Sequence, residues 1–301
     1  MSLVARDWLY GHRVGAFRRS GPSPRQGADT NKTRLRLAAI AFAVVLVLGV
    51  GGYAVFSYVR PYLHATGCRA NGVSLALEQA ANAATIAMVA AGRELPERAL
   101  VIGYATAIQE SHIRNLPGGD RDSVGLFQQR PSQGWGSRKR LMDPVYAANR
   151  FFDVLVKVRN YLDRPVHDAA QRVQRSADGS AYAQHVTTAQ ALAAAYLGRR
   201  PASVTCYATP GRRTPERRAA ALGDLRRALD SPRVLGDRVR DDSVGVGSRR
   251  TGWTLAAWAV SHAQPYGLTE IRYAGWRWTA DRGYAGWSED DQAPAGRVIV
   301  R

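Results

Sequence analysis

The order of apolar and polar positions divides the chain into stretches of different character. Residues 37–59 read LAAIAFAVVLVLGVGGYAVFSYV and contain no charged side chain. As a helix with a rise of about 1.5 Å per residue, this stretch spans about 34 Å, and the hydrocarbon core of a membrane is roughly 30 Å thick. Buried helices of soluble proteins rarely run this long without a charge. The pattern therefore predicts one transmembrane helix.

Beyond this stretch, apolar residues recur at the spacing of amphipathic helices. Ser74 is placed to cap a helix that runs to about Ala91, and Pro96 fits the first turn of the next helix. In that second helix, one apolar stripe is formed by Leu100, Val101, Tyr104, Ala105 and Ile108. Further helices are expected at 144–162, 166–176 and 180–197, and an irregular or β-hairpin segment is expected at 114–136. We therefore predict a mainly α domain over residues 60–206.

The pattern changes after residue 206. Residues 207–250 contain eleven arginines among Pro, Gly, Asp and Ser. This composition predicts an Arg-rich linker with one helical stretch, Pro215–Leu229. The positive charge of the linker fits a solvated face, and it equally fits a contact with an anionic polymer.

The last segment, residues 251–301, is rich in aromatic residues. It holds five of the seven tryptophans: Trp253, Trp258, Trp276, Trp278 and Trp287. Thr251 is placed to cap a helix to about Ala263, and Glu270–Trp278 and Arg297–Val300 read as strands. We expect a small α+β C-terminal module whose rings form its core, because a domain of this size needs them there. Stacking of the rings on sugars is the other interpretation.

The net charge limits the classes of partner, and the basic residues before the apolar span predict its orientation in the membrane. The formal net charge is +18, which favours polyanionic neighbours such as anionic lipid, an anionic cell wall or nucleic acid. No helix-turn-helix, zinc-finger or RNA-binding signature is present in the sequence, so nucleic acid is not expected. Residues 1–36 contain eight basic residues: Arg6, Arg13, Arg18, Arg19, Arg25, Lys32, Arg34 and Arg36. Under the positive-inside rule, they predict a cytoplasmic tail, an uncleaved signal-anchor at 37–59 and an extracytoplasmic remainder.

The cysteines suit that location. Cys68 and Cys206 are the only two in the chain, and both lie on the predicted outer side, where disulfides persist. We expect them to pair with each other, and two buried free thiols are the alternative. No Cys/His cluster has metal-ligand spacing, so no metal site is expected.

Residues 105–135 carry the most informative polar pattern. Glu110 ends an apolar segment, a Gly-rich acidic turn follows at 118–122, and the segment GLFQQ comes next at 125–129. This order resembles the lysozyme-like superfamily of lytic transglycosylases and goose-type lysozymes, in particular its membrane-anchored actinobacterial branch. In that superfamily a helix ends in Glu-Ser and a Gly-Leu-Met-Gln-like segment follows; here Phe127 takes the Met position. The resemblance covers residues 68–206 and implies a lysozyme-like fold.

The resemblance assigns the chemistry to Glu110. A carboxylic acid protonates a glycosidic oxygen at neutral pH where an apolar site raises its pKa. Glu110 would protonate the bond between N-acetylmuramic acid and N-acetylglucosamine, helped by the substrate's acetamido group. It would then act as base on the muramic C6 hydroxyl, which releases a 1,6-anhydro product. Ala99, Gly103 and Thr106 share the helix face of Glu110, and their small size predicts room for a sugar.

Asp120 and Asp122 offer a second mechanism. Goose-type enzymes similarly carry aspartates downstream of their Glu, and either residue is a candidate to hold a water on the opposite sugar face for an inverting hydrolysis. Both aspartates also suit a turn whatever the function, because Asp and Gly favour turns. Arg121 is placed to pair with them. The sequence leaves both outcomes open.

Other residues are substrate-binding candidates by the same resemblance. The Gln of the family's Gly-Leu-x-Gln segment lines the sugar site and corresponds to Gln128, and Gln129 adds a second amide. Ser111 follows the Glu as in the family. The family also has a later tyrosine that bonds to the catalytic Glu. Tyr182 and Tyr196 are the candidates for it, and we favour Tyr182.

The sequence therefore indicates a membrane-anchored enzyme that cleaves peptidoglycan glycan strands without a cofactor, as a lytic transglycosylase rather than a hydrolase. A non-catalytic wall-binding or scaffold protein with the same fold is the alternative. A basic partner of a membrane surface or of nucleic acid is a third interpretation.

Overall fold

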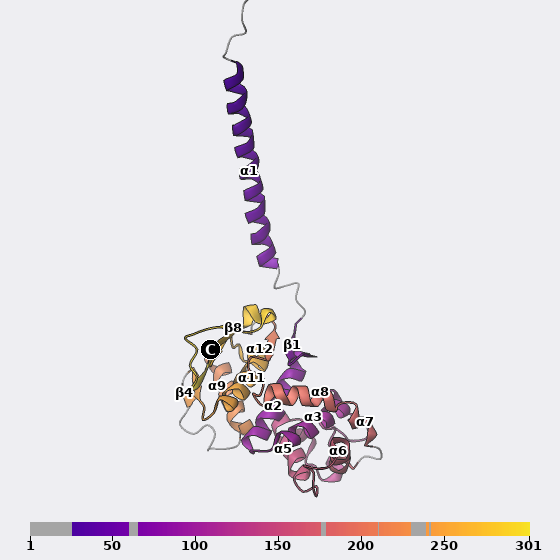
Figure 1. Ribbon diagram of the computed structural model, residues 1–301. Helices are drawn as coiled ribbons and strands as arrows, with labels where there is room; N and C mark the ends of the chain where they lie inside the picture. Colours follow the sequence, from indigo (N-terminus) through magenta and orange to yellow (C-terminus); the bar gives the residue numbers. More distant parts are fainter. Residues whose placement is uncertain (1–25, 60–65, 176–178, 210, 230–238, 241) are drawn as a thin grey trace, which may run out of the picture. The chain divides into compact units, whose positions relative to one another are not determined.

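The computed structural model describes residues 26–59, 66–175, 179–209, 211–229, 239–240 and 242–301. The chain divides into two compact units, residues 1–59 and residues 60–301. Within the first unit, the described residues form one long helix, α1 (Gln26–Val59) (Figure 1).

Helix α1 matches the expected apolar span and extends it. Lys32–Ser57 is long and apolar enough to cross a membrane, and none of it is buried. A signal sequence meets the same criterion, so the length and composition of the helix are consistent with either a membrane anchor or a signal segment. It begins at Gln26 rather than at residue 37, and the rest of the predicted basic tail, residues 1–25, lies outside the described residues.

The second unit is mainly helical, as predicted (Figure 1). Its described helices are α2 (Leu77–Gly92), α3 (Glu97–Ser111), α4 (Arg138–Leu141), α5 (Pro144–Leu155), α6 (Val166–Gln174), α7 (Ser180–Ala183), α8 (Val186–Tyr196), α9 (Pro215–Leu229), α11 (Arg249–Ser261) and α12 (Ala263–Tyr266), with 3-10 turns η2 (Pro131–Gln133) and η4 (Ala280–Ala285). Two predicted caps are wrong. Ser74 lies in a strand and α2 begins after Ala76, while Thr251 lies inside α11, where Ser248 is the cap and accepts from the Thr251 N–H.

A small antiparallel sheet closes the predicted 60–206 region on itself. Its strands are β1 (Gly67–Ala70), β2 (Val73–Leu75) and β3 (Val204–Tyr207), in the order β2-β1-β3. Cys68 and Cys206 are direct cross-strand partners in β1 and β3 and form a disulfide, which confirms the predicted pairing. The bridge therefore joins the beginning and the end of the region that contains Glu110.

The C-terminal part contains the predicted helix and a second antiparallel sheet. Its described strands are β4 (Val239–Arg240), β5 (Ser243–Gly245), β6 (Glu270–Tyr273), β7 (Trp276–Thr279), β8 (Ser288–Glu289) and β9 (Arg297–Val300), in the order β4-β5-β9-β6-β7-β8. The segment expected as one strand at 270–278 is a hairpin of β6 and β7. Ala274 and Gly275 form its turn with positive φ angles of 48° and 87°, which suits a two-residue hairpin loop.

The C-terminal part packs directly on the helical part, and residues 60–301 are one compact unit. The Trp278 indole N–H donates to Thr205 Oγ1 (3.1 Å), and the Trp287 indole N–H donates to the Val204 carbonyl (2.7 Å), both in the disulfide-bonded strand β3 or at its start. Helix α9, inside the expected linker, buries Ala221 and Leu225 and contacts α2. The tryptophans are therefore packing residues of this unit.

Candidate functional site

Helix α3 places Glu110 on its last turn, where the chain leaves the core. Residues 99–107 of the helix are buried, and Glu110 itself is half-buried. His112 and Ile113 then end the helix with φ angles of 53° and 58°. A β-branched residue rarely adopts this left-handed conformation, and such strain persists where surrounding contacts enforce it, often at functional sites. Here the Asn82 side chain of α2 donates to the Ile113 carbonyl (2.9 Å).

A tyrosine from α7 reaches Glu110. The Tyr182 hydroxyl donates to Glu110 Oε1 at 2.7 Å, and the Tyr182 ring is buried. Within the described residues, this is the one hydrogen bond of the Glu110 carboxyl. Tyr196, the other candidate, lies in the core, where its hydroxyl is 3.3 Å from the Ala80 carbonyl and 3.2 Å from Ser261 Oγ. The structure thus brings Tyr182, and not Tyr196, to Glu110.

A histidine that the sequence analysis did not single out lies beside this pair. His185 Nε2 is 2.9 Å from Oε1 of Gln109, the residue before Glu110. Burial, with a smaller contribution from the nearby His112 charge, lowers the pKa of His185 below its ordinary value. The feature of the sequence that could have identified His185 is its position three residues after Tyr182. Together, Tyr182 and His185 fasten the α7–α8 corner to the end of α3.

Ser111 connects α3 to the GLFQQ segment. The buried Ser111 hydroxyl lies 2.7 Å from the Leu126 carbonyl and 3.1 Å from the Ala107 carbonyl, and it serves as donor to them. Gly125, which begins the segment, has φ of 79°, and a Cβ there would lie 2.6 Å from the Leu141 carbonyl oxygen. Glycine is therefore required at this close approach. Ser111 positions the backbone beside Glu110 and is not exposed to a substrate.

The two glutamines of the segment point to different surroundings. Gln128 is half-buried, has φ of 46°, and its side chain donates to the Gly125 carbonyl (3.1 Å) and lies against Gly119 of the acidic turn. Gln129 is 1% exposed, and its amide donates to the Ala147 carbonyl of α5 (3.2 Å). Gln128 is therefore partly accessible from solvent, whereas Gln129, predicted to bind substrate, is enclosed in the core.

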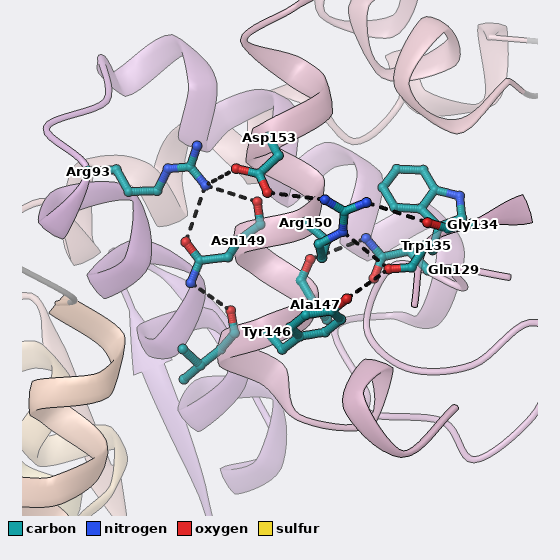
Figure 2. Close-up of polar contacts among 10 residues, drawn as sticks. Arg93, Gln129, Gly134, Trp135, Tyr146, Ala147, Asn149, Arg150 and Asp153 are labelled. Atoms are coloured by element: carbon teal, nitrogen blue, oxygen red, sulfur yellow. Dashed lines mark hydrogen bonds and ion pairs between the residues drawn. The ribbon is translucent and has the colours of Figure 1, made fainter. Parts of the chain in front are cut away.

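Helix α5 fixes the loop that follows the segment (Figure 2). Arg150 Nε and the Tyr146 hydroxyl both donate to the Trp135 carbonyl, at 3.2 and 3.1 Å. One turn further along α5, Asp153 lies between Arg150 and Arg93, the residue that follows α2, with ion pairs of 3.4 and 2.9 Å. Figure 2 shows this chain of contacts running from Arg93 to the loop carbonyls. Two polar side chains thus hold the loop end, and the Trp135 side chain is buried.

The acidic turn holds its two aspartates differently. Asp122 Oδ1 accepts from Arg130 Nε (2.8 Å) and Ser132 Oγ (3.0 Å), and Oδ2 accepts from the Ser132 N–H (2.7 Å). These bonds, first that of the Ser132 N–H and then that of Arg130, hold the pKa of Asp122 well below its usual range. The Asp120 side chain is 89% exposed, with Arg121 at 3.9 Å. Among the described contacts, neither aspartate meets Glu110.

The small-residue face of α3 does not leave room for a sugar, contrary to expectation. Ala99 and Thr106 are 0% exposed. A Cβ at Gly103 would lie 3.4 Å from the Phe152 ring and 3.6 Å from the Phe151 ring, both of α5. The small side chains admit the α5 phenylalanines, and Phe127 stacks on Phe151 with ring centroids 4.5 Å apart. At this end of α3, Ile108, Gln109 and Glu110 are half-buried, and Ser111 is buried.

No metal centre competes with this interpretation in the part of the chain that the structure describes, where no group of three or more His, Cys, Asp or Glu residues could hold an ion. The chain matches no model of a known protein family and no curated protein.

Proposed function

We propose that this protein is a membrane-anchored enzyme that cleaves the glycan strands of peptidoglycan, with Glu110 as general acid and base. The observation that carries the proposal is the hydrogen bond from Tyr182 to Glu110 Oε1. The resemblance, which covers residues 68–206, offered Tyr182 and Tyr196 as candidates for this contact and favoured Tyr182, which lies in another helix, 72 residues further along the chain than Glu110.

The surroundings of Glu110 support an acid–base role. The carboxyl is half-buried at the end of a helix whose preceding residues are core, and Tyr182 occupies Oε1 as a donor. A proton on the carboxyl is then directed to Oε2, which can present it to a glycosidic oxygen. Ser111 fixes the GLFQQ backbone next to this point, and Gln128 remains accessible as a polar contact for a sugar.

The reaction proposed for this site proceeds in two steps. Glu110 gives its proton to the oxygen between C1 of N-acetylmuramic acid and the next sugar, and the C1–O bond breaks while the acetamido oxygen stabilises the positive C1. The Glu110 carboxylate then takes the proton of the C6 hydroxyl, and the C6 oxygen bonds to C1. The carboxyl is again protonated, and the product has a 1,6-anhydro ring.

The state of the aspartates favours this route over inverting hydrolysis. A carboxylate that activates water as a base needs a free acceptor site and a proton affinity close to the working pH. Asp122 accepts three hydrogen bonds, and they lower its pKa. Asp120 is open to solvent at the edge of the turn. We therefore assign Asp122 to the structure of the acidic turn and keep a single catalytic carboxylate.

The location follows from α1 and the disulfide. An N-terminal helix able to cross a membrane and a Cys68–Cys206 bridge fit a domain held outside the cytoplasm. The basic residues before the apolar span support the orientation with the N-terminus in the cytoplasm. The enzyme would then meet the cell wall as a polymer beside the membrane.

Release of soluble fragments from purified peptidoglycan tests the proposal. The full chain in detergent is compared with Glu110→Gln, which keeps an acceptor for the Tyr182 hydroxyl, and with Glu289→Gln, an exposed glutamate of β8. We expect release by the wild-type chain and by Glu289→Gln, and a loss of at least about a hundredfold in Glu110→Gln. Equal release by both variants would remove Glu110 from the mechanism, and binding without release by a folded wild-type chain would indicate a scaffold.

A further inference from the structure

A cavity lies where the C-terminal part meets the helical part, at the end of α3 opposite to Glu110. Its volume is about 580 Å³, within the range of roughly 300–1,000 Å³ that small-molecule sites occupy. Glu97, in the first turn of α3, is on its lining, thirteen residues before Glu110. At about 1.5 Å per residue, the two carboxyls are about 20 Å apart along the helix. The cavity is therefore separate from the proposed cleavage site.

The lining combines an apolar floor with a few charged groups. The floor comes from helices α2, α9 and α11 and from the segments that follow α2 and α8, and it includes Met88, Leu95, Leu197, Leu229 and Leu255. Apolar walls with a small number of polar groups are typical of ligand sites, and such sites often lie between domains. The position of this cavity, between the part that contains Glu110 and the C-terminal part, satisfies both conditions.

Two arginines at the cavity share one carboxylate. Arg199, which follows α8, and Arg250, in the first turn of α11, both pair with the one carboxylate of Glu97, the second at 3.8 Å. Both arginine side chains are more than half exposed. A guanidinium has five N–H donors, and a carboxylate is its preferred partner. The described contacts use one bond of Arg199 to Glu97 and one of Arg250 to the Leu197 carbonyl (3.2 Å), so donors remain for a second carboxylate.

One acidic group of the lining is complementary to a cation. Glu94 follows α2 with φ of 54°, and it is exposed. Its carboxylate has no hydrogen bond or ion pair within the described part of the chain. The cavity thus presents surplus N–H donors, a carboxylate that is unpaired among the described residues and an apolar floor. A fatty carboxylate would satisfy the first and the last of these features, whereas a short peptide with free ends satisfies all three.

We propose that this cavity binds a short apolar peptide with a free carboxylate and a free amino group. The apolar side chain would fill the floor, the carboxylate would pair with Arg199 and Arg250, and the amino group would pair with Glu94. This site is independent of the proposed cleavage reaction, and it gives the junction of the two parts a binding role.

Calorimetric titration of the full chain in lipid nanodiscs tests the site. The probes are the tripeptide Ala-Leu-Ala with free ends, its C-terminal amide, its N-acetyl form and octanoate. We expect saturable binding of the free tripeptide, about tenfold weaker binding of the amide and of the N-acetyl form, and no comparable binding of octanoate. Absence of saturable tripeptide binding, equal binding of peptide and amide, or tighter binding of octanoate would overturn the proposal.

Variants separate a direct contact from a structural effect. Arg250→Gln should weaken binding of the free tripeptide about tenfold and leave binding of the amide unchanged. The substitution and the amidation of the peptide each remove the same ion pair, so their effects should not add. Val246→Trp, at a half-buried lining position, should abolish binding by filling the cavity. Arg282→Gln, an exposed arginine outside the lining, should bind as the wild type does. Glu110→Gln should also bind normally, so a failure of the cleavage assay and a failure of this site are distinguishable. Additive losses from amidation and Arg250→Gln would contradict the pairing.

Discussion

A single buried hydroxyl orients the carboxyl on which the proposed chemistry depends. Tyr182 is fixed by its burial, so its 2.7 Å bond to Glu110 Oε1 limits the rotation of a half-buried side chain that would otherwise be free to turn. Preorganisation of this kind matters because a catalytic acid must lie within hydrogen-bond reach of the leaving oxygen.

Removal of that hydroxyl should reduce turnover without unfolding the protein. In Tyr182→Phe the ring packing remains, and the Glu110 carboxyl loses its orienting donor. We expect kcat for glycan cleavage to fall roughly 10- to 100-fold, in line with one bond to a carboxylate worth about 1.5–3 kcal/mol. Tyr196→Phe is the matched control, because its hydroxyl lies in the core and should affect stability alone. Equal effects of the two variants on kcat would contradict the assignment.

At this scale, the sequence identified the polar residues better than their surroundings. Glu110 and Tyr182 were chosen from motif positions, and the structure places them in contact. Gln129 was expected at the sugar, yet it is buried against α5. Neighbouring amides diverge here because Gln128 adopts φ of 46°, and no composition rule predicts a left-handed glutamine. His185 was missed because its partner, Gln109, is 76 residues away.

Among elements, the junction of α3 with the GLFQQ segment sets the geometry of the site. Ser111 joins the two through the Leu126 carbonyl, and Gly125 allows close contact with the end of α4. Both contacts are made to backbone carbonyls, so a change of one atom at Ser111 or Gly125 affects the position of the whole GLFQQ segment.

Ser111→Ala should show that this junction is structural and also necessary for activity. Loss of one buried hydrogen bond should lower the free energy of unfolding by about 1 kcal/mol and the melting temperature by about 2–4 °C. The displaced backbone should also lower cleavage activity at temperatures where the variant is folded. Thermal unfolding and a cleavage assay on the same sample check both. Unchanged activity together with the stability loss would show that the segment is not part of the site.

The contact of α2 with α11 contains a buried histidine that makes stability depend on pH. His262 stacks on Trp258, with centroids 4.2 Å apart, and its Nε2 faces Thr85 Oγ1 of α2 at 3.4 Å. Burial lowers the pKa of His262 to about 4, partly opposed by its bond to the Trp258 carbonyl and by Asp224. The unfolded chain, with a His pKa of about 6.5, binds the proton first as the pH falls. This contribution to stability is therefore complete above about pH 6.5 and decreases toward pH 4.

Denaturant unfolding at pH 7.5 and pH 5 checks this dependence. Over this interval His262 should account for a loss of about 2 kcal/mol, an order-of-magnitude figure from the linkage relation. His262→Gln should lack this part of the loss, whatever its effect at pH 7.5, whereas His112→Gln, an exposed histidine, should keep it. The same pH dependence in the wild type and His262→Gln would show that the histidine is not buried in its neutral form.

The positions of the helices were largely predictable from the sequence, but which helices pack against each other was not. The 3.6-residue period indicated α2, α3 and α6 near their observed positions, whereas the helix expected at 144–162 ends at Leu155 and the one expected at 180–197 is divided into α7 and α8. The small face of α3 was assigned to a sugar because the sequence does not say which helix packs there. Two phenylalanines of α5 occupy that face, and only the tertiary arrangement reveals this.

For the molecule as a whole, the disulfide is a covalent constraint between two segments that are far apart in the sequence. Cys68 and Cys206 are 138 residues apart and lie opposite each other in β1 and β3. Strand β3 also receives the Trp278 and Trp287 contacts of the C-terminal part. Loss of the bridge should therefore loosen both parts.

The double variant Cys68→Ser with Cys206→Ser measures this constraint. Chain-entropy arguments assign about 5 kcal/mol to a loop of this length, equivalent to a melting temperature roughly 10–20 °C lower. Unfolding of the full chain in detergent, compared with the wild type without reductant, checks the value. Coincident transitions would show that the bridge contributes nothing to the folded unit.

Domain organisation was only partly readable from the sequence. The apolar span and the cysteine pairing follow from local composition and location. The Arg-rich segment was expected as a linker because of its many arginines. Its helix α9 nevertheless buries one apolar stripe, which includes Ala221, Leu225 and Leu229. The tryptophan-rich segment belongs to the same compact unit, since the indole N–H groups of Trp278 and Trp287 donate to Thr205 and Val204 of β3.

The mass of the products from purified peptidoglycan tests the central claim most directly. The full chain in detergent should release muropeptides that end in 1,6-anhydro-N-acetylmuramic acid, lighter by one water than the hydrolysis products, and Glu110→Gln should release none. Reducing-end products that disappear in Glu110→Gln would keep the catalytic glutamate but contradict the single-carboxylate route. The absence of any product from a folded wild-type chain would contradict the enzyme itself.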